Sequence, residues 1–165
     1  MRVPGAGGIG SRARGGGTRR TWATLGVAPL LLLAVVPGGC GGGGDKAVKV
    51  HATEFSLKPD RSSVGSGNVK FAVDNDGGLE HEFVVVRAAD VSSLPTKADG
   101  SVDESRIPES DKVGEIPGVP PDKTKSATFR VEKGSYVAFC NITNGKGAGA
   151  VNHFKNGMHT TFTVK

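Results

Sequence analysis

The chain has 165 residues, of which 21 are lysine or arginine and 16 are aspartate or glutamate. The first 39 positions hold 5 of the basic residues and none of the acidic ones, so the remainder carries no net formal charge. A body without a basic surplus lacks the positive surface that nucleic acid binding requires, and we exclude nucleic acid as a partner.

Residues 1–39 are typical of an export signal. Several arginines, among them the pair Arg19 and Arg20, precede an apolar stretch over 25–36 that ends in proline and glycine. This stretch is shorter than the roughly 20 apolar residues that a membrane-spanning helix needs. We therefore expect 1–39 to be a cleaved signal peptide. The arginine pair resembles a twin-arginine signal, although an ordinary arginine-rich leader explains it equally well.

Cys40 follows the small residues at the end of the leader, as in the lipobox of bacterial lipoproteins, which this region resembles. Pro37 stands where that pattern usually has leucine, so the sequence leaves lipidation open. Residues 40–46 are rich in glycine and are expected to be a flexible tether. The resulting expectation is a protein held by a lipid on Cys40 at the outer face of the bacterial cytoplasmic membrane.

Residues 47–165 are enough for one domain. Short runs rich in β-branched and aromatic residues alternate with turn signals, and no stretch has convincing helical periodicity. The expected strands are 47–52, 69–73, 83–86, 127–131, 136–139 and 160–164. This spacing predicts an all-β fold, a Greek-key antiparallel sandwich or barrel.

Residues 88–125 interrupt this rhythm with five prolines and many charges. A segment of this length exceeds an ordinary connection, so it either wraps the sandwich or is a partly disordered insertion. We expect at most one short helix in it, near 90–94.

The rarest side chains of the body lie near one another in the sequence. Cys140 is the only cysteine besides Cys40, and Met158 is the only methionine besides Met1. His153 stands between them, and a second imidazole is available at His81. A thiolate, two imidazoles and a thioether are the ligand set of a blue copper site.

Over nearly all of 47–165 the chain resembles the cupredoxins, the family of plastocyanin and azurin. The segments that carry the resemblance are 54–59, 71–77, 81–85, 134–141 and 153–158. The resemblance implies that His81, Cys140, His153 and Met158 bind one copper ion of type 1. It also implies single-electron transfer with redox partner proteins that the sequence does not identify.

The chain departs from this family in two places. Twelve residues separate Cys140 from His153, where the commoner loops have two to four, and we expect the small residues 144–150 to bulge outward. Glu82 follows His81 where asparagine is frequent in the family. His159, adjacent to Met158, competes with it as axial ligand. Because neighbours in an extended segment face opposite ways, only one of them can point at the metal, and the resemblance favours Met158.

Three functions remain open from the sequence. The first is a blue copper electron carrier, the second a copper-binding or copper-delivery lipoprotein without redox turnover, and the third a metal-free interaction domain. Another metal in the same ligand set also stays open. The sequence has no His-Glu-x-x-His motif and no nucleophile elbow, so we do not expect an enzyme. His51 has no companion ligand and is expected to lie on the surface.

Overall fold

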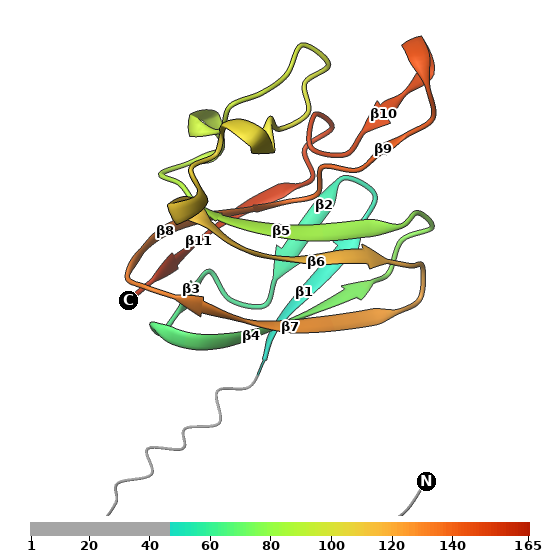
Figure 1. Ribbon diagram of the computed structural model, residues 1–165. Helices are drawn as coiled ribbons and strands as arrows, with labels where there is room; N and C mark the ends of the chain where they lie inside the picture. The colour runs from blue at the N-terminus through green and yellow to red at the C-terminus, as the bar shows by residue number, and fades with distance from the viewer. Residues whose placement is uncertain (1–46) are drawn as a thin grey trace, which may run out of the picture. The chain divides into compact units, whose positions relative to one another are not determined.

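The computed structural model describes residues 47–165, which form a sandwich of two β-sheets (Figure 1). The first sheet has the order β2-β1-β4-β7, with bounds Ser56–Pro59, Val48–Thr53, Gly67–Asn75 and Thr124–Val131. The second has the order β3-β11-β8-β5-β6, with bounds Ser63–Val64, His159–Val164, Gly134–Phe139, His81–Arg87 and Lys112–Val119. The predicted all-β sandwich is confirmed.

Most neighbouring strands run antiparallel, as predicted, but two pairs are parallel. These are β1 with β4 and β11 with β3, so each sheet is mixed. A separate hairpin, β9 (Thr143–Asn144) with β10 (Val151–Asn152), stands out from the sandwich after β8 (Figure 1).

Alternation of side chains builds the core between the sheets. In β1, Val48, Val50 and Ala52 are buried whereas the residues between them are exposed, the period-2 pattern of a strand with one wet face. The centre of the core is Phe71 of β4, whose ring lies 5.5 Å from that of Phe83 in the other sheet. Aromatic packing therefore joins the two layers directly.

Strands β5 and β8 of the second sheet are buried on both faces. Their central residues form continuous apolar runs, which is the pattern of a strand covered from both sides. The outer faces of β5 and β8 pack against Leu94, Val102, Ile107 and Phe154. Residues 88–111, which follow β5 and are called the wrapping segment below, therefore pack on the sandwich and add a second, smaller core. Of the two alternatives left open by the sequence, a wrapping segment and a partly disordered insertion, the structure has the first.

This wrapping segment contains single turns of 3₁₀ helix rather than longer helices. They are η1 (Val91–Ser93), η2 (Glu104–Arg106) and η3 (Glu109–Asp111), and a fourth turn, η4 (Gly147–Gly149), follows β9. The first lies where the sequence predicted a short helix, and its start is capped by Asp90, which accepts from the Ser93 amide. Within residues 47–165, no helix is long and apolar enough to cross a membrane.

Strand β6 corrects the sequence prediction, which placed its residues in the insertion. The strand pairs with β5 through two register shifts, and it contains Gly114, Pro117 and Gly118. Gly114 lies so close to the ring of Phe129 that a Cβ atom there would stand 2.5 Å from it. Close packing of two strands therefore required a residue that sequence patterns interpret as a strand breaker.

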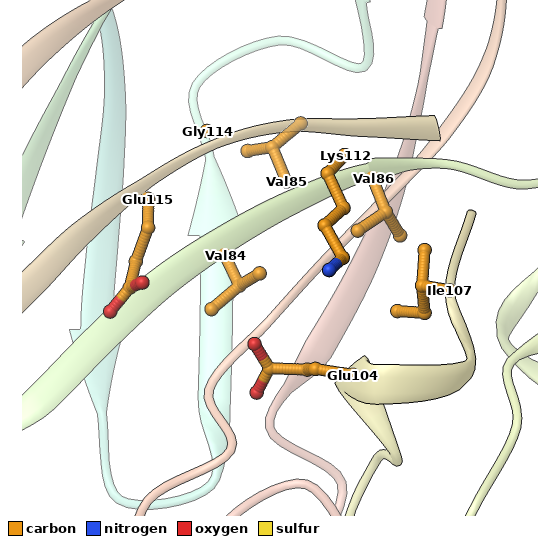
Figure 2. A pocket seen from close by; sticks show the side chains of 8 residues that line it. All are labelled: Val84, Val85, Val86, Glu104, Ile107, Lys112, Gly114 and Glu115. Atoms are coloured by element: carbon orange, nitrogen blue, oxygen red, sulfur yellow. The ribbon is translucent and has the colours of Figure 1, made fainter. Parts of the chain in front are cut away.

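A cavity of ≈ 180 Å³ lies where the wrapping segment meets β5 and β6. Figure 2 shows Val84, Val86 and Ile107 among the residues that line it, together with the charged side chains of Glu104, Glu115 and Lys112. None of the predicted metal ligands lines this cavity.

The signal peptide predicted over 1–39, the predicted lipidation of Cys40 and the predicted tether over 40–46 all fall outside the described residues.

Candidate metal centre

His81 is the first residue of β5 and follows a tightly held turn. The buried side chain of Asn75 donates to the carbonyls of Leu79 at 2.7 Å and Val119 at 2.8 Å. The Glu54 carboxylate accepts from the amides of Gly78 at 2.6 Å and Leu79 at 3.0 Å. These hydrogen bonds fix the backbone just before His81, and this defines where its imidazole lies in the sandwich.

Cys140 directly follows the last residue of β8 and is fully buried. Its amide donates to the carbonyl of Met158 at 3.0 Å, and its Sγ accepts from the amide of Glu82 at 3.4 Å. The residue after His81 is a glutamate and not an asparagine. The backbone amide of Glu82 supplies the hydrogen bond to sulfur.

His153 and Met158 lie on one compact turn before β11. The amide of Met158 donates to the carbonyl of His153 at 3.0 Å, and the amide of His153 donates to that of Ile142 at 2.9 Å. Gly157 takes a φ of 100° inside this turn, a conformation that favours glycine. The turn brings Met158, which is fully buried, beside Cys140 through the backbone bond already described.

The donor atoms of three residues converge in the interior. The Nδ1 atoms of His81 and His153 are 3.2 Å apart, and the Sγ of Cys140 is 3.3 Å from Nδ1 of His153. All three donors lie within 4.8 Å of one another, and each residue is buried. Two imidazoles and a thiolate in this arrangement are the equatorial set of a type 1 copper site.

The spacing of these atoms fits a metal ion. An ion at the centre of a triangle, with bonds of about 2.0 Å to nitrogen and about 2.3 Å to sulfur, would hold its two nitrogens about 3.5 Å apart and each nitrogen about 3.7 Å from the sulfur. The observed 3.2 Å between the nitrogens and 3.3 Å between sulfur and Nδ1 of His153 are slightly shorter than these values. The other ring nitrogen of His81, Nε2, is buried and has no hydrogen-bond partner among the described residues.

Burial controls the protonation of the donors. It lowers the pKa of His81, with a smaller contribution from His153, and it also lowers the pKa of His153. Burial raises the pKa of the Cys140 thiol to about 11. The metal-free centre therefore holds neutral imidazoles, which are ready to bind an ion, and a neutral thiol, which must lose its proton first.

Asn141, next to Cys140, ties the metal centre to the wrapping segment. Its side chain exchanges hydrogen bonds with the backbone of Val102, at 2.8 Å and 3.0 Å, and donates to the Glu104 carboxylate at 2.7 Å. Its amide donates to the carboxylate of Glu82 at 2.7 Å, and burial raises the pKa of that carboxyl. The wrapping segment thus supports the residues beside Cys140, a role that the sequence did not reveal.

The remaining histidines are placed outside this cluster. His159 is half-buried and packs against Phe154, with ring centroids 5.3 Å apart. His51 is exposed and pairs with Asp76 at 2.8 Å. Of the competing neighbours, Met158 is the one fully buried beside Cys140.

Residues 144–150, expected to bulge outward, do so only in part. They lie in the β9–β10 hairpin, but the Asn144 side chain turns back to Nε2 of His153 at 2.8 Å. No motif marked this contact, because it depends on the orientation of one side chain in a glycine-rich loop.

Comparison with known proteins gives a structural likeness. No protein-family model matches the chain, and no curated protein sequence matches it. Auracyanin from the photosynthetic bacterium Roseiflexus castenholzii has a TM-score of 0.50 and 18% identity, over 72% of this chain and 96% of that one. An azurin from Methylomonas sp. strain J has a TM-score of 0.47 and 17% identity, over 73% of this chain and 98% of that one. From the auracyanin match and the two-sheet architecture, the chain has the cupredoxin-like fold.

Proposed function

We propose that the protein binds one copper ion as a type 1 site and carries single electrons. The observation that carries this proposal is the buried convergence of two imidazole Nδ1 atoms and one thiol Sγ. In the proposed site His81, Cys140 and His153 are the equatorial ligands and Met158 is the weak axial ligand. Copper bound in this way supplies one-electron redox chemistry.

The protein contributes a set of ligand atoms that are held rigidly and buried away from water. His81 is placed by the Asn75 and Glu54 hydrogen bonds, and Cys140 and Met158 are joined through the backbone. Because the ligand positions are fixed by strands and tight turns, we expect little rearrangement when the ion changes charge. Burial of the donors excludes water that would otherwise bind the metal.

We also propose that the protein acts outside the cytoplasmic membrane, attached through a lipid on Cys40, with residues 47–165 as its one domain. The support is the composition of the leader over 1–39 and the glycine-rich tether over 40–46. Mass spectrometry of the membrane fraction tests this: a mature chain that begins at a diacylated Cys40 is expected. A chain that starts elsewhere would contradict the anchor without affecting the copper site.

Retention of copper separates electron transfer from copper delivery. The copper-loaded protein is passed through repeated cycles of reduction with ascorbate and oxidation with ferricyanide, in the presence of a Cu(I)-chelating dye. An electron carrier is expected to keep its copper through every cycle. Transfer of the ion to the dye at the first reduction would contradict our proposal and support the delivery function.

A further inference from the structure

The imidazole of His153 has both ring nitrogens engaged. Nδ1 lies in the donor cluster, 3.3 Å from Sγ of Cys140 and 3.2 Å from Nδ1 of His81. Nε2, at the other side of the ring, is 2.8 Å from Nδ2 of the Asn144 side-chain amide. The ring of Phe55 packs edge-on against it, with centroids 5.5 Å apart. Phe55 therefore restrains the orientation of the His153 ring, and Asn144 restrains its outer nitrogen.

His81 differs from His153 in this respect. It is equally buried, but its Nε2 has no hydrogen-bond partner within residues 47–165. The protein therefore holds the outer nitrogen of only one of the two rings by a side chain. That side chain comes from the β9–β10 hairpin, within the unusually long connection between Cys140 and His153.

If Nδ1 of His153 is to bind a metal, the chemistry of a neutral imidazole sets what this contact must be. Only one ring nitrogen carries a proton, so Nδ1 offers a lone pair to a metal only when the proton is on Nε2. Nε2–H then needs an acceptor, and the Oδ1 atom of Asn144 is one. The oxygen and nitrogen of an amide have nearly the same shape, so turning the Asn144 amide by about 180° brings Oδ1 to the place that Nδ2 holds, 2.8 Å from Nε2.

We propose that Asn144 is a positioning residue that holds His153 in the tautomer with the proton on Nε2 and Nδ1 free for the metal. The long connection between Cys140 and His153 thereby has a chemical role, which is to bring an acceptor to the buried ring. A hydrogen bond from the outer nitrogen also makes the inner nitrogen a better donor. The proposal rests on the proposed function only in treating His153 as a copper ligand, because the tautomer is a property of the metal-free protein.

The test begins with the metal-free protein and does not depend on copper. Nitrogen-15 NMR of the histidine rings is expected to show His153 in the Nε2–H form in the wild type and in Asn144→Asp, whose carboxylate accepts in any orientation. Asn144→Leu has a similar volume and no acceptor, so we expect this preference to be lost. Zinc(II), which has no redox chemistry, is expected to bind Asn144→Leu about 10- to 100-fold more weakly than it binds the wild type.

The copper-loaded protein adds a second readout. The reduction potential is expected to rise in Asn144→Leu, because a poorer nitrogen donor stabilises Cu(II) less, and to fall in Asn144→Asp. Two exposed positions of the same hairpin region provide matched controls. Lys146→Leu places a leucine on the hairpin, and Thr143→Asp places a carboxylate next to Asn144. Both controls are expected to keep the wild-type tautomer and zinc affinity.

Two results would overturn the inference: a wild-type His153 with its proton on Nδ1, or an Asn144→Leu variant with unchanged tautomer and zinc affinity. Failure of the proposed function has a different signature. In that case the wild type gives no thiolate-to-copper absorption with Cu(II), whereas the tautomer of His153 still depends on Asn144.

Discussion

Copper is expected to raise the free energy of unfolding by about 4 kcal/mol when its free concentration is about 1,000 times Kd. The reason is that the donors come from separate parts of the chain. His81 begins β5, Cys140 follows β8, and His153 lies before β11, so the unfolded chain cannot bring them together. Thermal unfolding with and without Cu(I), added anaerobically to protect the thiol, measures this difference.

Two histidine variants make the experiment specific. His81→Ala removes one donor from the cluster, so the difference between the copper-loaded and metal-free forms is expected to shrink to a small fraction of its wild-type value. His51→Ala removes an exposed imidazole that pairs with Asp76 and is expected to keep the full difference. Because each variant is compared with its own metal-free form, any direct loss of stability cancels. Full copper stabilisation of His81→Ala would contradict the ligand assignment.

Phe71→Ala is expected to lower the free energy of unfolding by about 3–5 kcal/mol, the range for removing a buried aromatic ring. Phe71 is 1% exposed and lies in β4, between β1 and β7. Its ring contacts those of Phe83, Phe129 and Phe162, with centroids 5.5–5.8 Å apart. These partners come from both sheets, so the cavity would open at the centre of the sandwich.

Urea unfolding of the metal-free protein measures this loss. Leu79→Ala is a suitable control, because Leu79 is 37% exposed and most surface substitutions change stability by about 0.5 kcal/mol or less. Phe71→Leu, which keeps much of the buried volume, is expected to fall between the two. A loss below about 1 kcal/mol for Phe71→Ala would contradict the central place that we give this ring.

The sequence predicted the strands whose side chains follow a simple pattern. The alternation in β1 and the apolar run in β5 result from burial on one face and on both faces, and each leaves a direct mark on residue type. Strand β2, which ends at Pro59, was not among the expected strands, and β6 was missed because of its glycines and proline. In both cases the strand forms because of its pairing with a neighbouring strand, and local residue propensity does not predict it.

The donor cluster was predictable because it depends on rare residue types. Cysteine and methionine are so scarce in the body that their positions carry information by themselves, and His81 and His153 complete a known ligand set. The supporting residues were not predictable in this way. Asn141, Asn144 and the amide of Glu82 act through hydrogen bonds whose partners are up to 59 positions away. Such pairings follow from the three-dimensional path of the chain.

The visible absorption spectrum after addition of one equivalent of Cu(II), recorded beside that of Cys140→Ala, tests the proposed copper site most directly. We expect an intense thiolate-to-copper band in the wild type that is lost in the variant, because Sγ of Cys140 lies in the donor cluster. Absence of the band from the wild type, or its persistence in Cys140→Ala, would contradict a type 1 copper site built on this thiol.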